Sequence, residues 1–308
     1  MPSRLPLAPR LGPLAIPLLR GAGQVFLQGH AGCGLLVLLA LAWGGPGLLG
    51  AALLGTLASG LTARLLDCRR AAIDTGVYGY NGLLLGLLLG LSFTWTPLLG
   101  LAIVAGAAFS GLLLRPTLRR RAGPAALPAY TWPFVTIGWS LLALGTPLGL
   151  SPRPGELPVT LPFNGLNLVA APFRSLAQVV FLDSFGAGLC LWLGLLWANA
   201  RLAGWALCGA SGGLLFGLWQ EGSTPAVLAG LAGYNPALAA LALGRQRTPL
   251  PALCGAVLSC ILQPGFIALG LPALTAPFIL ACWLVLASQR LWSRMTLEAH
   301  LHPLRKSP

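Results

Sequence analysis

Long apolar runs separated by short polar turns make up most of this chain. In the first half they predict helices at 13–27, 32–43, 46–65 and 97–114, followed by one that opens at Leu127. In the second half they predict helices at 173–184, 185–200, 203–219, 249–269 and 271–288. Runs of this length with so few charges are typical of helices that cross a membrane.

Two shorter apolar stretches, 76–91 and 224–243, interrupt this pattern. Both are rich in small residues, and both contain a Tyr-Asn pair, Tyr80-Asn81 and Tyr234-Asn235. A spanning helix needs about 20 apolar residues. We therefore predict a re-entrant half-helix in each stretch, with Asn81 and Asn235 in a structural role there.

The octet LPAYTWPF at 127–134 returns as LPALTAPF at 271–278. Gln24 and Gln178 are 154 residues apart, as are the two Tyr-Asn pairs, while Thr131 and Thr275 are 144 apart. The same order of motifs in both halves indicates a duplicated unit of roughly 150 residues. Proline costs little in the first turn of a helix, so each octet predicts a helix start that carries a hydroxyl among apolar neighbours.

The repeat divides the chain into residues 1–145, a linker at 146–172, a second repeat at 173–289 and a basic tail at 290–308. About five crossings per half form an odd number, so the second half lies upside down. The predicted fold class is an all-α polytopic membrane protein of two inverted repeats. Each repeat has about five transmembrane helices and one re-entrant half-helix, and a central pore lies at the repeat interface.

Charge supports an orientation with both termini cytoplasmic. The inside segments then hold twelve basic residues, among them Arg4, the run 115–121 and Arg245. The outside segments hold six, which are Arg64, Arg69, Arg70, Arg153, Arg174 and Arg201. This bias follows the positive-inside rule, although the cluster at 64–70 runs against it.

Composition gives the same class. The chain is 56% hydrophobic and 8% charged, with a mean hydropathy of +0.81. A soluble domain carries about 25% charged residues, so the net charge of +13 is better explained by membrane-flanking arginines than by nucleic acid. Arginine far outnumbers lysine, and Ala, Gly and Leu dominate, which is typical of a GC-rich bacterial gene and predicts a bacterial inner membrane.

Cysteine and histidine give no sign of a metal centre or a cofactor. Six of the seven cysteines lie within apolar runs, and no CxxC occurs. No acidic or cysteine partner stands at ligand spacing from the three histidines. We expect packing cysteines, no metal and no cofactor.

The polar positions that the repeat pairs are Gln24/Gln178, Tyr80/Tyr234, Asn81/Asn235 and Thr131/Thr275, and all are neutral. No paired carboxylate, arginine or histidine is expected among them. Since an ion in transit usually leaves ionisable groups along its path, we predict a small, uncharged substrate that forms hydrogen bonds.

These motifs resemble the urea transporter family, from about Arg20 to Gln289, with the doubled LPxxTxPF as the signature. The resemblance implies a homotrimer in which each protomer has its own pore. It further implies that urea passes in single file between aromatic side chains and beside oxygen atoms.

Carried over by resemblance, Gln24 and Gln178 bind urea at the two mouths, and Tyr80 and Tyr234 form slot walls. Thr131 and Thr275 supply hydroxyls in the narrow middle, which is lined by Leu84, Val179 and Leu238. The resemblance also matches Phe181 to a slot phenylalanine.

One departure from the family pattern concerns the first-half counterpart of Phe181. Leu27 stands there, with Phe26 beside it. Either that slot has one aromatic wall only, or Phe26 fills the missing place.

Two other classes of transport protein stay open. A channel for short amides, ammonia or water differs from a urea channel only in pore detail, and an ion-coupled secondary transporter shares the inverted repeat. An enzyme is not expected, because the sequence contains no nucleophile–base pair or metal cluster.

Overall fold

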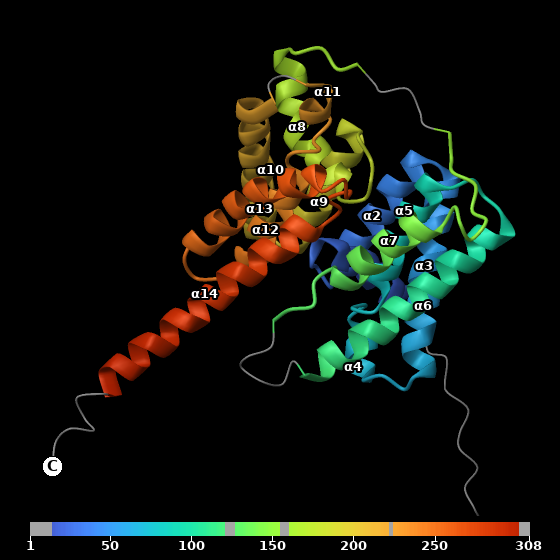
Figure 1. Cartoon of the computed structure of the whole chain (residues 1–308), viewed down its shortest axis with the longest axis horizontal. Helices are drawn as coiled ribbons and strands as arrows, with labels where there is room; N and C mark the ends of the chain where they lie inside the picture. The colour runs from blue at the N-terminus through green and yellow to red at the C-terminus, as the bar shows by residue number, and fades with distance from the viewer. Residues whose placement is uncertain (1–13, 121–126, 155–159, 222–223, 302–308) are drawn as a thin grey trace, which may run out of the picture.

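The chain forms an all-helical bundle (Figure 1). The computed structural model describes residues 14–120, 127–154, 160–221 and 224–301. Within these ranges extended backbone pairs only at an isolated bridge between Phe93 and Pro152. The basic lead before residue 14, part of the run 115–121, part of the expected linker and the last seven residues lie outside the described residues.

The α-helices of the described residues fall into two sets of seven that correspond in order. The first set is α1 (Ala15–Gly23, followed by the 3-10 turn η1, Gln24–Phe26), α2 (Ala31–Gly44), α3 (Pro46–Leu65), α4 (Arg70–Asp74), α5 (Gly79–Ser92), α6 (Pro97–Arg120) and α7 (Trp132–Leu144). The second set is α8 (Gly165–Gln178), α9 (Phe185–Ala198), α10 (Ala200–Glu221), α11 (Pro225–Leu228), α12 (Tyr234–Leu243), α13 (Leu250–Ala268) and α14 (Ala276–Leu301). The duplication that the motifs indicate therefore extends to every described helix.

Within the part of the chain that the structure describes, five helices are long and apolar enough to cross a membrane, namely Pro46–Leu65, Pro97–Leu118, Ala200–Gln220, Leu250–Ala268 and Ala276–Met295. The bent pair of α1 and α2 adds a sixth if it is counted as one span. Many large apolar side chains on these helices are exposed, among them Leu101, Leu215 and Trp219. Such a surface suits lipid rather than water, so the chain is an integral membrane protein.

The sharp bend of the first half lies between α1 and α2 and not in the predicted re-entrant stretch 76–91. The run 13–27 is not one helix, because α1 ends at Gly23 and the chain then turns before α2 at an angle of 79°. The predicted re-entrant stretch 76–91 instead contains α5, an unbroken helix of 14 residues that is buried along almost its whole length. At 1.5 Å per residue α5 is shorter than a bilayer core, so a half-spanning role for it stays a prediction.

Each octet contains a turn followed by the first residues of a helix, so the predicted helix start lies within the octet and not at its first residue. α7 begins at Trp132 and α14 at Ala276, five residues later than expected in both cases. The cause is a left-handed residue in each octet, Tyr130 at φ 48° and Leu274 at φ 43°, which a right-handed helix cannot contain.

The expected linker also ends early, because α8 begins at Gly165, inside the segment 146–172. The Asn164 side chain caps this helix by accepting from the backbone N–H of Asn167 at 2.8 Å. Pro172 lies inside α8, so its presence in the sequence did not mark a boundary.

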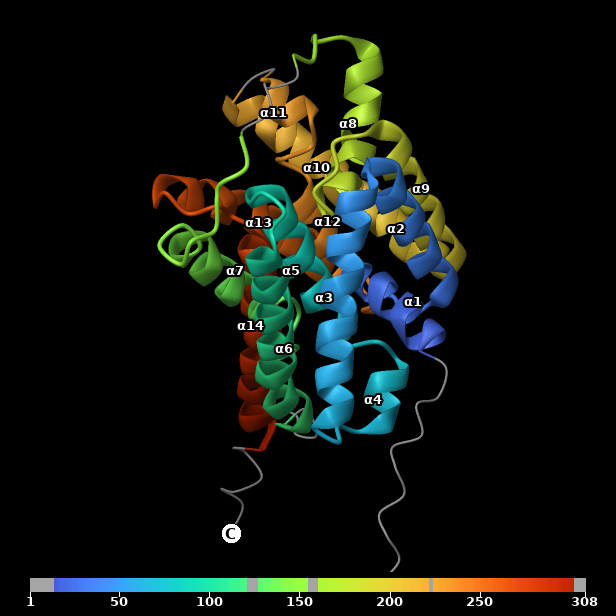
Figure 2. The ribbon, with the colours of Figure 1, turned by 90° about the vertical axis from the view of Figure 1, so that its right-hand side faces the viewer.

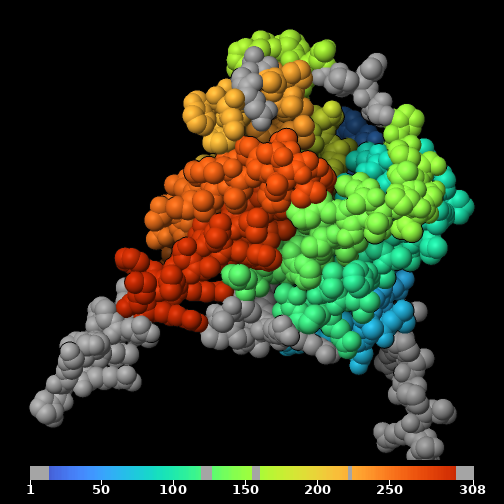
Figure 3. Space-filling view, in the orientation of Figure 1, coloured from blue at the N-terminus to red at the C-terminus, as the bar shows by residue number. Residues whose placement is uncertain are grey.

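Reciprocal contacts relate the two halves by a pseudo-two-fold axis. The indole N–H of Trp139 in α7 donates to the carbonyl of Pro272, and that of Trp283 in α14 donates to the carbonyl of Pro128, both at 2.8 Å. Exchange of the same contact in both directions is the mark of a two-fold relation. Each octet is thereby held by the helix that follows the other, and the halves meet along a continuous seam (Figure 3).

The helices that carry the Tyr-Asn pairs lie inside the bundle. α5 packs against α3, α6 and α7, and α12 packs against α10, α13 and α14 (Figure 2). Asn81 and Asn235 are completely buried. The first turns of α5 and α12 thus face the junction between the halves.

Two groups of arginines lie at the opposite end of the molecule from that predicted. Arg69 and Arg115 line the same cavity of about 300 Å³, so they cannot flank the membrane on opposite sides. Arg201 donates to the carbonyl of Gln246 at 2.7 Å, beside Arg245. The error arose because the break at α1–α2 was counted as two crossings. The corrected placement moves Arg64–Arg70 and Arg201 to the arginine-rich end and strengthens the positive-inside bias.

We predict that Gly76→Ala and Gly230→Ala destabilise the protein, because both glycines have positive φ, 75° and 89°. A Cβ atom at Gly76 would also lie 2.2 Å from the backbone nitrogen of Gly21. The strain amounts to about 1–3 kcal/mol for each site. The apparent unfolding temperature in detergent measures it, with Gly50→Ala as the control, since nothing lies within 4 Å of a Cβ there. Equal unfolding temperatures for Gly76→Ala and Gly50→Ala would contradict the prediction.

Candidate functional site

The hydroxyls of Thr131 and Thr275 lie 2.7 Å apart, one from each octet. Both side chains are buried, at 3% and 4% exposure. Two hydroxyls carry two donors and four acceptor positions, and their mutual bond uses one of each. The pair therefore offers one O–H and several lone pairs to a third molecule at the junction of the repeats.

Aromatic rings surround the threonine pair. Tyr80 in α5 donates its phenolic O–H to the carbonyl of Tyr130, which fixes that ring beside the first octet. Tyr130 meets Phe278 edge to face, with ring centroids 4.9 Å apart. Phe134 meets Phe181 in the same manner at 6.3 Å. The last residue of each octet, Phe134 or Phe278, thus supplies a ring that contacts a ring of the other half.

The side chains of Asn81 and Asn235 form hydrogen bonds with the backbone of the two octets. The amide oxygen of Asn81 accepts from the backbone N–H of Phe134 at 3.1 Å, and that of Asn235 accepts from Phe278 at 3.3 Å. These bonds satisfy N–H groups in the first turns of α7 and α14, which have no partner within the helix. In both halves the asparagine oxygen therefore binds the backbone of the octet, as its predicted structural role requires.

The two asparagines differ in the hydrogen bonds that their side-chain nitrogens make. The Asn235 nitrogen donates to the side-chain oxygen of Gln263 and to the carbonyl of Leu274. The buried nitrogen of Asn81 has no partner among the described residues. The carbonyl equivalent to that of Leu274 is in Tyr130, and the Tyr80 hydroxyl occupies it.

Gln24 and Gln178 make the same contact in the two halves. Each donates from its amide nitrogen to a backbone carbonyl at 3.0 Å, Gln24 to Thr75 and Gln178 to Ala229. The amide oxygens of both side chains have no partner among the described residues. The half-buried glutamines can therefore accept a hydrogen bond but have one donor already engaged.

Sequence reasoning missed one charged pair, Arg20 and Arg174, which are also 154 residues apart. Arg20 donates to the carbonyl of Asp74 at 2.9 Å, and Arg174 donates to that of Leu228 at 3.3 Å. The predicted pore pairs did not include these arginines, although the predicted helix 173–184 contains Arg174. Both guanidinium groups bind backbone carbonyls, one turn before the paired glutamines.

Leu27 and Phe181 occupy matching turns with left-handed backbone, at φ 57° and φ 61°. Both side chains are half-buried. Phe26 is buried at 1% exposure in the core of the bundle, and its second-half counterpart is Val180. Leu27 therefore holds the backbone position that matches Phe181, and Phe26 holds the one that matches Val180.

The apolar residues expected in the narrow middle are all buried. Leu84 and Leu238 have 1% and 2% exposure, and Val179 has 3%. They belong to the same core cluster as Phe134 and Phe278. These phenylalanines are the second feature that sequence reasoning missed, although the shared last letter of the octets could have indicated them.

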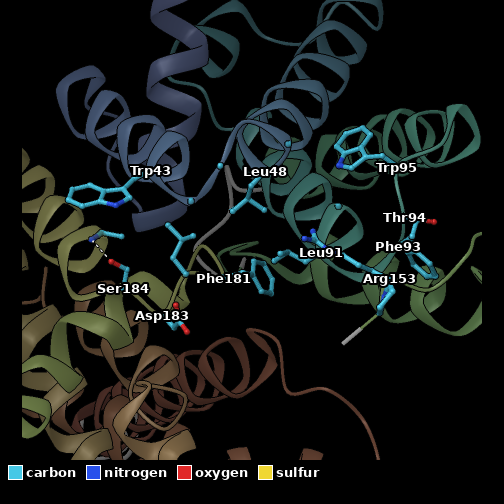
Figure 4. A pocket seen from close by; sticks show the side chains of 17 residues that line it. Trp43, Leu48, Leu91, Phe93, Thr94, Trp95, Arg153, Phe181, Asp183 and Ser184 are labelled. Atoms are coloured by element: carbon cyan, nitrogen blue, oxygen red, sulfur yellow. Dashed lines mark hydrogen bonds between the residues drawn. The ribbon is translucent and has the colours of Figure 1, made fainter. Parts of the chain in front are cut away.

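A cavity of about 710 Å³ opens beside Phe181 (Figure 4). Its wall comes from the end of α2, the start of α3, the end of α5 and the turn between α8 and α9. In Figure 4 Phe181 lies between Leu48 and Leu91, with Trp43 and Trp95 on opposite sides. Arg153 and Asp183 are the charged residues in this wall. The wall of this cavity thus combines aromatic and aliphatic side chains with polar and charged ones.

Among the described residues no group of three or more His, Cys, Asp or Glu could hold a metal ion. The polar groups that meet at the junction are hydroxyls and amides.

The reciprocal repeats, the membrane-length helices and the neutral polar junction together define a polytopic membrane transport protein. Residues 16–290 match the family model of the urea transporters. The chain is 29% identical over 293 residues to "Urea transporter 1" of Capra hircus and equally to that of Ovis aries, covering 87% of this chain and 75% of each relative. It is 28% identical to "Urea transporter 1" of Rattus norvegicus over 246 residues, which are 74% of this chain and 62% of the relative.

The chain belongs to the urea transporter family. This membership confirms the resemblance that the doubled octet indicates. It also places the protein among transporters and not among enzymes.

We predict that replacing both threonines by valine, Thr131→Val with Thr275→Val, slows solute flux strongly. Valine keeps the shape and deletes the hydroxyls, which leaves a polar solute short of a partner at a cost of about 1–3 kcal/mol. That cost corresponds to a roughly 5- to 150-fold slower rate. Stopped-flow urea efflux from proteoliposomes measures the effect.

The matched control for the threonine pair is Thr62→Val. The Thr62 hydroxyl bonds back to the carbonyl of Ala58 within α3, so its loss should leave flux unchanged. Normal flux in the double valine variant would give the two hydroxyls a purely structural role.

Proposed function

We propose that this protein is a passive, selective channel that lets urea cross the membrane in single file. The observation that carries the proposal is the buried Thr131–Thr275 pair at the junction of the two repeats. Membership of the urea transporter family supports urea as the substrate.

The chemistry of the junction suits a flat, neutral amide. Removing water from an unsatisfied amide costs roughly 2–7 kcal/mol, and the threonine hydroxyls and glutamine oxygens are acceptors that replace that water. Aromatic faces favour a planar solute and leave little room for a bulkier one. An ion would find no charged compensation for its dehydration among the threonines, asparagines and leucines of the middle.

The path that we propose runs from the cavity beside Phe181 to the turn at Leu27. It passes Gln178 at one mouth and Gln24 at the other, with Tyr234 and Tyr80 as ring walls. Leu238, Val179 and Leu84 line the narrow middle with the threonine pair. The pseudo-two-fold relation supports this path, because the corresponding residues come from matching elements of the two halves.

The membrane setting of the channel is proposed as follows. Each half crosses the bilayer five times, by α1–α2 together, α3, α5, α6 and α7 and by their counterparts, so the repeats are inverted. In this proposal α5 and α12 are short crossings and replace the predicted re-entrant half-helices. The arginine-rich end, where α6 and α14 end, faces the cytoplasm in a bacterial inner membrane, with both termini on that side. The resemblance to the family supports a homotrimer with one pore in each protomer.

We predict that urea runs down its own gradient and stops at equal concentration. The reason is that Thr131, Thr275, Asn81 and Asn235 are neutral and that Arg20 and Arg174 are engaged with backbone carbonyls. Among the described residues a titrating side chain for proton coupling is therefore missing from the narrow middle of the proposed path. Proteoliposomes with imposed Na⁺, pH or voltage gradients provide the measurement.

Uphill accumulation of urea under any of these gradients would replace the channel by an ion-coupled transporter. Equal permeability to urea, short amides and water would widen the substrate class to small neutral solutes.

We predict that the rings of Tyr80 and Tyr234 matter for flux and that their hydroxyls do not contact the solute. Tyr80 already gives its O–H to the carbonyl of Tyr130. Tyr80→Phe and Tyr234→Phe should therefore retain most of the urea flux. Tyr80→Ala and Tyr234→Ala should reduce it by roughly two- to tenfold, the value of one aromatic contact. Unchanged flux in both alanine variants, with normal membrane insertion, would remove the tyrosines from the pore.

A further inference from the structure

Arg245 reaches from the second half to the turn of the first half at Leu27. Its guanidinium donates to the carbonyl of Leu27 at 2.6 Å and to the side-chain oxygen of Gln28 at 3.4 Å. The guanidinium remains exposed while it makes these bonds. A permanent positive charge is thereby held beside the position where the slot phenylalanine is missing.

The turn that carries Arg245 is itself fixed. Gln246 and Gln289 in α14 exchange two amide hydrogen bonds, at 3.2 and 2.8 Å. Arg201 at the start of α10 donates to the carbonyl of Gln246 at 2.7 Å. The position of Arg245 is therefore set by α10 and α14 as well as by its own bonds to the first half.

The repeat places no arginine at the matching position of the other mouth, where the two charged residues, Arg153 and Asp183, have opposite signs. The spacing of 154 residues, which relates Gln24 to Gln178, relates Leu91 to Arg245. Leu91 lies in the wall of the cavity beside Phe181 (Figure 4). The same spacing relates Gly47 and Phe93, which also line that cavity, to Arg201 and Arg247.

An acidic residue stands at the mouth of Phe181 and has no acidic counterpart at the mouth of Leu27. Asp183 lies in the wall of the cavity beside Phe181, and Gly29 occupies the matching position next to Leu27 and Gln28. The two mouths are thus built from the same elements and differ in charge. Three arginines stand at one mouth where glycine, leucine and phenylalanine stand at the other.

We propose that Arg245 makes the mouth at Leu27 reject planar cations, so that charge selects the solute where an aromatic wall is absent. The proposal rests on the proposed urea pathway and adds the residue that discriminates at one of its ends. The solute that tests it is the guanidinium ion, which has the planar shape of urea and a single positive charge.

The physical argument is that shape cannot separate these two solutes. A flat slot that accepts urea also accepts guanidinium, and hydroxyl and carbonyl oxygens accept from the NH₂ groups of both. Two like charges about 7 Å apart oppose each other by a factor of roughly threefold in bulk water and roughly fiftyfold near a protein surface. Urea is neutral and passes Arg245 without this opposition.

A purely structural role for Arg245 would also explain its bonds to Leu27 and Gln28. Exchanging the residues at this pair of matching positions separates the structural role from charge selection. Arg245→Leu gives this mouth the residue of the other one, and Leu91→Arg does the reverse. Arg245→Lys keeps the charge and loses the planar fork that binds two oxygens.

The experiment compares the two mouths in sealed membrane vesicles of opposite orientation that contain the full chain. Urea flux is followed by stopped-flow light scattering, with guanidinium chloride added outside at millimolar concentrations and sodium chloride as the matched salt. The concentration of guanidinium that halves the urea flux is determined for each orientation, relative to the uninhibited flux of the same variant.

We expect the wild-type protein to need about tenfold more guanidinium at the mouth of Arg245 than at the mouth of Phe181. Arg245→Leu should abolish this difference, and Arg245→Lys should keep it. Leu91→Arg should raise the half-blocking concentration at the mouth of Phe181. Near 1 M ionic strength, where the screening length falls to about 3 Å, the wild-type difference should shrink, which a structural role does not predict.

A sided difference that persists in Arg245→Leu, or that is absent from the wild type, overturns the proposal. If Arg245→Leu does not insert into the membrane, Leu91→Arg decides, and an unchanged block at the mouth of Phe181 then overturns it. Absence of urea flux in the wild-type protein without guanidinium would be a failure of the proposed function itself, and the first measurement of the series detects it.

Discussion

The hydrogen bond between Thr131 and Thr275 joins the two halves at a buried point on their pseudo-two-fold axis. Two short polar side chains can meet at 2.7 Å only if both octets approach each other with their backbone turned away from regular helix. The left-handed residues Tyr130 and Leu274 provide that turn. Asn81 and Asn235 then bind the N–H groups that the octets leave at the starts of α7 and α14. The arrangement of polar groups at the junction depends on this single approach.

The same symmetry makes the differences between the halves informative. The Tyr80 hydroxyl binds the carbonyl of Tyr130, whereas the Asn235 nitrogen binds the equivalent carbonyl of Leu274. Leu27 and Phe181 share a backbone conformation but not an aromatic ring. Because the backbone is common to both halves, each of these differences resides in side-chain chemistry. The repeat therefore supplies an internal control for nearly every substitution at the junction.

The duplication and the paired polar residues could be read from sequence, because spacings of 154 and 144 survive where residues were retained. The turns in the octets could not be predicted from sequence, because neither residue propensity nor hydropathy indicates a left-handed backbone at Tyr130 or Leu274. The bend between Phe26 and Ala31 could not be predicted for a related reason, because hydropathy does not indicate in which direction one apolar helix follows another. That one missed break reversed the predicted side of Arg64–Arg70, which shows how strongly topology depends on counting crossings.

The uncharged residues in the middle of the pathway do not by themselves explain how its two mouths differ toward cations. The threonines and asparagines at the junction exclude ions by leaving dehydration uncompensated, and this acts on any ion that arrives from either side. In our proposal the charges of Arg201, Arg245 and Arg247 act earlier and at one mouth, whereas the other mouth combines Arg153 with Asp183. A cation is then opposed before it loses water at one mouth and only afterwards at the other. The middle of the pathway thus determines whether an ion passes, and the mouths determine how often a cation occupies the site that urea needs.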